Sequence, residues 1–291
     1  MNSELKIEFY KNREIGERLF AATNFLKQNW RILLKNNLML SIPLAIVMGY
    51  TIQYVTSFSV LGDYEKYIPY LILHYILAIA GQIALFSMNG AIMIFYDKGK
   101  LKPGIGYSEW VKAMSPLALK SLLINLYIVG FAILVGLVCF IFASVSKFFI
   151  IPLVIILICG IVLIAPALLL IYYPAYFKNV EAWKSIQIAF RLGFKDWGRI
   201  FVAIIIFIIL AMIVSFVMGM PYQIYQALRL LSHSPVGDIN IFSCLFASFS
   251  TLGSLIITPV TFIYFAFQYF SIVEQEEGVS AHSMMDEFDR L

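Results

Sequence analysis

Long apolar stretches alternate with short polar segments along most of this chain. Six stretches are almost free of Asp, Glu, Lys and Arg, and a helix needs about 20 such residues to cross a bilayer. The predicted spans are 37–58, 68–95, 118–144, 148–173, 200–220 and 241–272. The last stretch is longer than one crossing requires, and Pro259 within it leaves open whether it forms one helix or two.

The pattern predicts an all-α protein, a polytopic membrane helical bundle. It divides into a cytoplasmic N-terminal segment (1–36), a membrane domain of six spans (37–273) and an acidic cytoplasmic tail (274–291). Composition agrees, because 61% of the 291 residues are hydrophobic and only 13% are charged. A soluble domain averages about 45–50% apolar and about 25% charged residues.

The distribution of Lys and Arg predicts the orientation in the membrane. Most of them lie in the N-terminal segment, between the second and third spans, and between the fourth and fifth spans. The opposite side carries only Lys66, Lys147 and Arg229. By the positive-inside rule both termini are cytoplasmic. The net charge of +4 is therefore explained by orientation, and no nucleic acid partner is expected.

Two basic segments beside the spans have the periodicity of amphipathic helices, and both carry tryptophan. Residues 13–36 place Ile15, Leu19, Ala22, Leu26, Trp30 and Leu33 on one stripe, and residues 180–198 place Trp183, Ile186, Phe190, Phe194 and Trp197 on another. Such helices lie in the membrane interface and favour anionic headgroups. The candidate lipid contacts are Arg18, Lys27, Trp30, Arg31, Lys35, Trp183, Lys184, Arg191, Lys195 and Trp197.

Residues 108–121 resemble a third such helix, with Trp110, Met114, Leu117 and Ser121 on one face. The chain then reads as three units, each an interfacial helix followed by two spans. Selection for membrane anchoring could produce the same pattern without duplication, so the threefold repeat stays open.

A few polar residues occur within the spans, among them His74, Gln82, Asn89 and Asn125. The first three share one face of the second span, and Asn125 in the third span is a possible partner. One interpretation is a polar track along a substrate path. The other, which we favour, is hydrogen bonding between helices.

The sequence contains no pattern that indicates catalysis, a metal site or a cofactor. The predicted spans hold no Asp or Glu, and neither a GxSxG nor an HExxH motif occurs. We therefore expect a protein that is not an enzyme. The acidic tail is expected to be solvated, or alternatively to bind a partner or the basic interfacial helices.

Residues 181–204 read EAWKSIQIAFRLGFKDWGRIFVAI. This stretch resembles the membrane domain found alone or beside glycerophosphodiester phosphodiesterase domains in bacteria, through Ser185, Phe190, Leu192 and Trp197. The preceding LIYYPAYF and the later FAFQYFSIVEQEEG also fit that family, and the start, RLFAATNFLKQNWRILLK, is similar to uncharacterised membrane proteins of Bacteroidetes-like bacteria. The resemblance implies a helical inner-membrane protein and carries over no catalytic residue.

These features favour a membrane scaffold, or an accessory protein of lipid or envelope processes, whose partners include anionic membrane lipids. The alternative is a transporter or channel for a lipid-like or neutral small solute. A central cavity that reaches the four polar side chains would favour the transporter, and a core packed with apolar groups would favour the scaffold.

Overall fold

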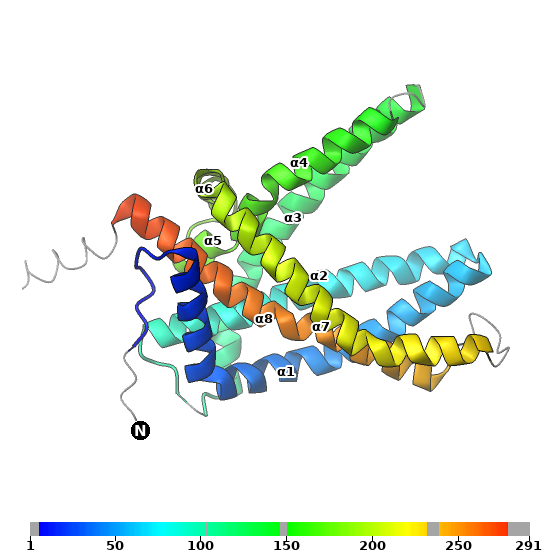
Figure 1. Cartoon of the computed structure of the whole chain (residues 1–291), viewed down its shortest axis with the longest axis horizontal. Helices are drawn as coiled ribbons and strands as arrows, with labels where there is room; N and C mark the ends of the chain where they lie inside the picture. The colour runs from blue at the N-terminus through cyan, green and yellow to red at the C-terminus, as the bar shows by residue number, and fades with distance from the viewer. Residues whose placement is uncertain (1–5, 103, 146–149, 232–238, 279–291) are drawn as a thin grey trace, which may run out of the picture.

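The computed structural model describes residues 6–102, 104–145, 150–231 and 239–278, and the regular elements of this part of the chain are all helices (Figure 1). They are α1 (Ile15–Leu61), α2 (Tyr64–Asp97), α3 (Tyr107–Val145), α4 (Ile150–Leu170), α5 (Tyr173–Phe177), α6 (Ala182–Lys195), α7 (Trp197–Leu231) and α8 (Ile241–Glu277). Six helical segments are long and apolar enough to cross a membrane, one for each predicted span. The expected all-α polytopic bundle is confirmed.

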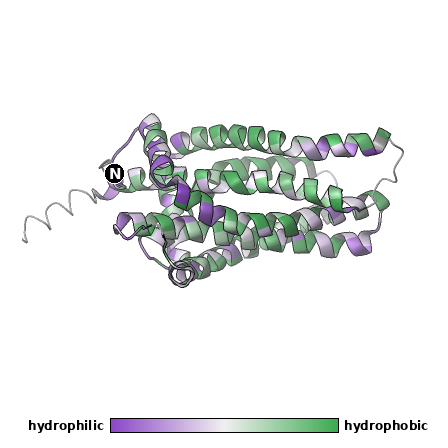
Figure 2. Cartoon of the chain, turned by 90° about the horizontal axis from the view of Figure 1, so that it is seen from below, coloured by the Kyte–Doolittle hydropathy of each residue, from purple (hydrophilic) through white to green (hydrophobic). Residues whose placement is uncertain are grey.

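Local signals explain where the helices begin and end. At the turn between α1 and α2, Gly62 adopts a left-handed conformation with φ of 70°, and the carboxylate of Asp63 accepts a hydrogen bond from the backbone N–H of Lys66. Asn240 caps α8 by accepting from the N–H of Ser243 at 2.9 Å. Hydrophobic residues cover the middle of the long helices, and hydrophilic residues gather toward their ends (Figure 2).

The helices run past the predicted segment boundaries. α1 continues through the boundary expected between residues 36 and 37, so the N-terminal amphipathic segment and the first span form one helix. The last apolar stretch is also one helix, α8, with Pro259 inside it. Because α8 extends to Glu277, the first acidic residues of the expected tail belong to a helix. Residues 279–291 lie outside the described residues, and so does Lys147, which stands between the third and fourth predicted spans.

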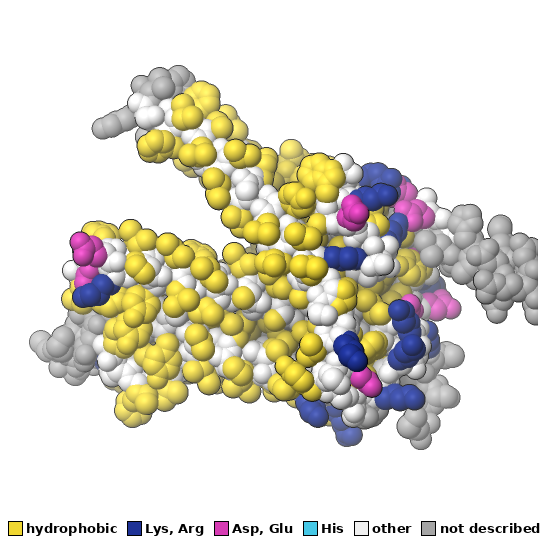
Figure 3. All heavy atoms as spheres, turned by 180° about the vertical axis from the view of Figure 1, so that it is seen from behind, with side chains coloured by type: hydrophobic (Ala, Val, Ile, Leu, Met, Phe, Trp, Pro, Cys, Tyr) yellow, Lys and Arg dark blue, Asp and Glu magenta, His cyan; other side chains and the backbone are white. Residues whose placement is uncertain are grey.

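One end of the molecule carries most of the described Lys and Arg side chains (Figure 3), and we call it the basic end. The first turns of α1 run across the long axis of the bundle there, and α6 is seen nearly end-on in the same view (Figure 1). Both amphipathic segments therefore lie across the spanning helices, as an interfacial position requires. The opposite end, where α1 turns into α2, is called the far end.

The expected third interfacial helix is not a separate element. Residues 107–121 are the first turns of α3, and the stripe proposed for them faces the protein, since Trp110, Leu117 and Ser121 are all buried. The threefold repeat itself stays a prediction.

The core of the molecule lies in the half nearer the basic end and is rich in aromatic residues. Its fully buried side chains include Phe25, Tyr173, Phe262, Phe265, Phe267, Tyr269 and Phe270. α8 supplies most of them and packs against α1 and α7. The short helix α5 enters this core, and the hydroxyl of Tyr173 donates to the backbone carbonyl of Phe262 at 2.9 Å.

α3 and α4 run side by side away from the other long helices (Figure 1), and a hollow separates this pair from them (Figure 3). Toward the tip their large apolar side chains are exposed, among them Phe131, Phe140, Ile151 and Ile156. Gly130 and Gly136 face open space, so they do not serve close packing between helices. Gly49 in α1 does, because a Cβ there would lie 2.4 Å from the Cα of Ser248 in α8.

Candidate functional site at the basic end

The outer face of the first turns of α1 presents basic and aromatic side chains. Lys27, Trp30, Arg31 and Lys35 are exposed, and the guanidinium of Arg31 lies 5.5 Å from the centroid of the Trp30 ring. Phe25 lies on the opposite, buried face of the helix. These four predicted lipid contacts are thus available at the surface.

α6 divides into two faces. Its small side chains pack on the protein, and a Cβ on Gly193 would lie 2.6 Å from the Cα of Ala167 in α4. Trp183, Lys184 and Lys195 are exposed on the other side. Because small residues allow α6 to lie close to α4, its aromatic and basic face is left for the surroundings.

Ser185 explains how α6 is held in place. Its hydroxyl donates to the carbonyl of Ile171 at 2.6 Å and accepts from the N–H of Ala175 at 3.0 Å. These groups flank the break between α4 and α5, where backbone groups lack helical partners. Trp197, another predicted lipid contact, is half-buried and donates its indole N–H to the carbonyl of Leu163 at 2.9 Å. Ser185 and Trp197, two of the four residues of the resembled motif, therefore have packing roles in this structure.

The acidic end of α8 pairs with the region around α6. Arg191 lies 3.4 Å from a carboxylate oxygen of Glu276 and 3.7 Å from one of Glu277, and Lys178 also pairs with Glu277. The expected alternative, in which acidic residues near the tail pair with a basic interfacial helix, is confirmed for these two glutamates. Arg191 is consequently less available to lipid than Lys184 or Lys195.

Arg18 is not a lipid contact, so that prediction is wrong. Its side chain is fully buried, and its Nη1 lies 3.0 Å from Oδ2 of Asp196, which stands between α6 and α7. Its Nε also donates to the carbonyl of Arg13 at 2.7 Å. A buried guanidinium needs a counter-charge and hydrogen-bond acceptors, and Asp196 and the Arg13 carbonyl supply them. Arg18 therefore points into the protein and away from lipid.

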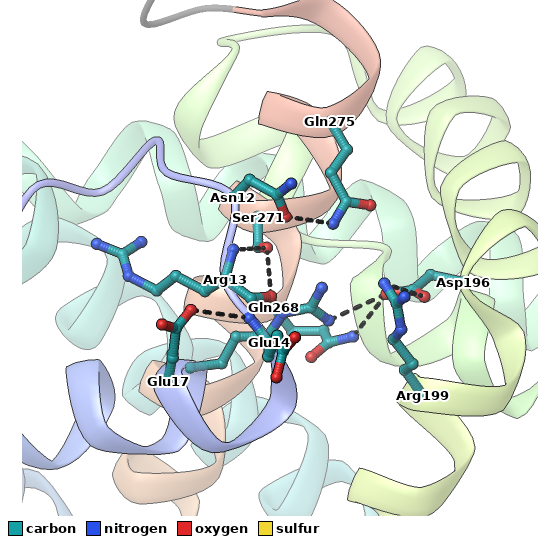
Figure 4. A network of polar contacts seen from close by, with 10 residues as sticks. Asn12, Arg13, Glu14, Glu17, Asp196, Arg199, Gln268, Ser271 and Gln275 are labelled. Carbon is teal, nitrogen blue, oxygen red and sulfur yellow. Dashed lines mark hydrogen bonds and ion pairs between the residues drawn. The ribbon is translucent and has the colours of Figure 1, made fainter.

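The carboxylate of Asp196 is shared by three elements of the fold. Besides Arg18, it accepts a hydrogen bond from the amide of Gln268 in α8 at 3.1 Å and lies 3.4 Å from Arg199 in α7 (Figure 4). Two features of the sequence point to this contact: the polar Gln268 lies in an apolar span, and the acidic Asp196 lies among basic residues beside the fifth span.

The segment before α1 is fastened to α8 next to this carboxylate. The backbone N–H of Arg13 donates to the hydroxyl of Ser271 at 3.0 Å, and that hydroxyl donates to the carbonyl of Arg13 at 3.2 Å (Figure 4). Burial lowers the pKa of Arg13, and the charges of Glu8 and Glu17 offset part of that effect. The basic end is therefore a joined surface of α1, α6, α7 and α8.

The four polar residues of the spans form separate contacts. The amides of Asn89 in α2 and Asn37 in α1 donate to one another at 2.9 and 3.2 Å, and Asn89 is fully buried. His74 Nδ1 lies 2.9 Å from the hydroxyl of Thr51 in α1. These pairs match the interpretation that the polar residues join helices.

Asn125 in α3 has its own hydrogen-bond partners. It accepts a hydrogen bond from the hydroxyl of Tyr172 at 3.3 Å, beside α5, and donates to the carbonyl of Ser121 in its own helix. Gln82 is half-buried in α2. Among the described residues, Asn125 forms no hydrogen bond with His74, Gln82 or Asn89.

Comparisons of the chain with protein-family models, curated proteins and solved structures found no match. The resemblance to the phosphodiesterase-associated membrane domain therefore stays an interpretation. What the fold itself defines is a class: a multi-pass helical bundle suited to a membrane, in which the first turns of α1 and the helix α6 lie across the long helices at the basic end (Figure 1).

Proposed function

We propose that this protein is a non-enzymatic membrane scaffold or accessory protein whose basic end binds anionic lipid headgroups. One observation carries the proposal: two segments that lie across the spanning helices expose basic and aromatic side chains (Figures 1 and 3). Tryptophan favours the headgroup level of a bilayer, and each Lys or Arg near an anionic surface contributes about 1 kcal/mol of attraction.

The proposal includes a location. The basic end faces the cytoplasm of a bacterial inner membrane, with both termini on that side. This is supported by the excess of Lys and Arg at the basic end, since cytoplasmic segments of membrane proteins carry that excess. Lipid or envelope processes on this membrane are the setting in which such a scaffold would act.

The alternative proposal, a transporter or channel, has less support. Asn89 is fully buried and paired with Asn37, and Asn125 is hydrogen-bonded to Tyr172 and Ser121 instead. A transport path would need such groups to line a shared cavity at mid-membrane depth.

Tryptophan fluorescence of the full chain provides the test. The chain has four tryptophans, Trp30, Trp110, Trp183 and Trp197, all in segments of the basic end. Purified protein is titrated in detergent with phosphatidylglycerol or phosphatidylcholine carrying brominated chains, because bromine quenches indole on contact. We expect stronger quenching by the anionic lipid at equal lipid concentration.

Matched variants test whether the preference for anionic lipid comes from the cations of the basic end or from the net charge of the whole protein. Replacing Lys27, Lys184 and Lys195 by Gln removes three exposed cations of the basic end and should reduce the preference for anionic lipid. Lys66→Gln at the far end removes an exposed cation elsewhere and should leave the preference unchanged. Equal quenching of the unmodified protein by both lipids would overturn the proposal.

A further inference from the structure

Two cavities adjoin between α1 and α3 at the basic end. The larger, of about 470 Å³, is lined mainly by apolar side chains, including Met39, Leu40, Met88, Val111 and Met114. The smaller, of about 170 Å³, is lined by Arg31, Lys35 and Lys102. Lys35, Asn36, Ile105 and Trp110 line both, so the two spaces share a wall and meet there.

The smaller space is a concentration of positive charge. Arg31 and Lys35 come from successive turns of α1, and Lys102 comes from the loop that joins α2 to α3. All three are exposed, and none forms an ion pair with another residue in the part of the chain that the structure describes. No Asp or Glu is among the residues that line either space. The site therefore complements a group with more than one negative oxygen.

The larger space is an open groove suited to a hydrocarbon chain. Met39 is 57% exposed and Val111 is 43% exposed, so both edges of the groove face the surroundings, while Trp110 is 6% exposed and forms part of its floor. Methionine side chains adapt to flexible apolar ligands. The volume falls within the range of about 300–1,000 Å³ that ligand pockets occupy.

We propose that this composite site binds one anionic phospholipid, with the headgroup phosphate at Arg31, Lys35 and Lys102 and one acyl chain along the groove between α1 and α3. The proposal rests on the proposed function and deepens it, because it assigns a single specific site within a surface that otherwise attracts anionic lipid through many charges. It also gives Lys102, which sequence analysis used only for orientation, a role in recognition.

A protein that retains only Trp110 tests the site, with Trp30, Trp183 and Trp197 replaced by Phe. Titration with brominated phosphatidylglycerol should quench Trp110 saturably. Replacing Arg31, Lys35 and Lys102 by Gln should raise the lipid concentration at half-maximal quenching by roughly tenfold to a hundredfold. Val111→Phe narrows the groove and should also raise that lipid concentration. Leu119→Phe, at an exposed apolar position of α3 outside the groove, should leave it unchanged.

Two further arms distinguish the possible results. Glycerol phosphate, a headgroup without a chain, should not displace the brominated lipid; full displacement would show a phosphate site without the acyl groove and would overturn the proposal. A second protein that retains only Trp183 reports lipid at α6. If Trp183 is quenched preferentially by anionic lipid and Trp110 is not, the specific site is wrong while the proposed function stands. If neither tryptophan distinguishes anionic from zwitterionic lipid, both are wrong.

Discussion

Arg18 and Asp196, which are 178 residues apart in the sequence, meet through a guanidinium–carboxylate contact of 3.0 Å. The arginine side chain is fully buried and the aspartate side chain is 11% exposed. The contact joins the first turn of α1 to the junction of α6 and α7. Gln268 of α8 donates a hydrogen bond to the same carboxylate, so α8 is joined to them as well. It thus holds the two interfacial segments in a common arrangement at the basic end.

Asp196→Asn should destabilise the fold strongly. The substitution leaves the Arg18 guanidinium buried without its counter-charge, and breaking a buried pair in this way costs about 3–5 kcal/mol. Thermal unfolding of the protein in detergent, followed by circular dichroism, measures the loss.

The double variant Arg18→Met with Asp196→Leu should recover most of that stability, because both charges are removed together. Asp63→Asn, which removes the exposed Asp63–Lys66 pair at the far end, is the control and should change little. An Asp196→Asn protein as stable as the unmodified one would show that the pair does not hold the basic end together.

Gly49→Ala should loosen the contact between α1 and α8. A Cβ at Gly49 would lie 2.2 Å from the hydroxyl oxygen and 2.4 Å from the Cα of Ser248, so the helices must separate, at a cost of about 1–3 kcal/mol. Gly130→Ala, in α3, meets no atom within 4 Å and should be neutral or slightly stabilising. Unfolding in increasing dodecyl sulfate compares the two; equal effects would contradict the close approach of α1 and α8.

Tyr10, in the segment before α1, should remain protonated well above its ordinary range. Burial raises the pKa of Tyr10 from 10.0 to about 12, and the charges of Asp97 and Glu277 add to the effect. Because the folded-state pKa is the higher one, the stabilising contribution is complete below about pH 10 and is lost as the pH rises toward 12.

The difference between the ultraviolet titrations of the unmodified protein and a Tyr10→Phe variant isolates this hydroxyl. The tyrosinate absorbance that disappears in the variant should belong to a transition near pH 12. A transition near pH 10 would show that the segment before α1 does not pack Tyr10 against Phe270 of α8 in solution.

The proposed orientation predicts which loops a membrane-impermeant maleimide can reach. Cys139, Cys159 and Cys244 are first replaced by Ala, and single cysteines are then introduced at Asp63 on the far end or Glu109 on the basic end. In intact cells the cysteine at 63 should react and the one at 109 should react only after the membrane is opened. The reverse result would invert the orientation and place the lipid-binding surface on the outer side.

Much of the fold was predictable because its main determinant is local. An apolar run of about 20 residues indicates a span wherever its partners lie, so each predicted span corresponds to a helical segment of the structure. The boundaries at residues 36 and 273 were less predictable. Both α1 and α8 continue through them, because a helix can pass from an interface into a bilayer without a change in backbone geometry.

The candidate site was predictable only in part. Periodicity placed Trp30 and Trp183 on apolar stripes and Lys27 off its stripe, all three as candidate lipid contacts, and all three are exposed. The same reasoning treated Arg18 as equivalent to Lys27, although one is buried and the other is not. Periodicity shows that two residues share a helix face, but it contains no information about which other helix covers that face.

By itself, then, the sequence determined the class of fold, the number of spans and the basic character of one side, since each depends on the local density of apolar and charged residues. Only the tertiary structure decided that Arg18 turns inward to Asp196, that Asn89 pairs with Asn37, and that Lys102 joins Arg31 and Lys35 beside an apolar groove. These relationships depend on which helices pack together, and that choice is made by complementary surfaces from distant parts of the chain.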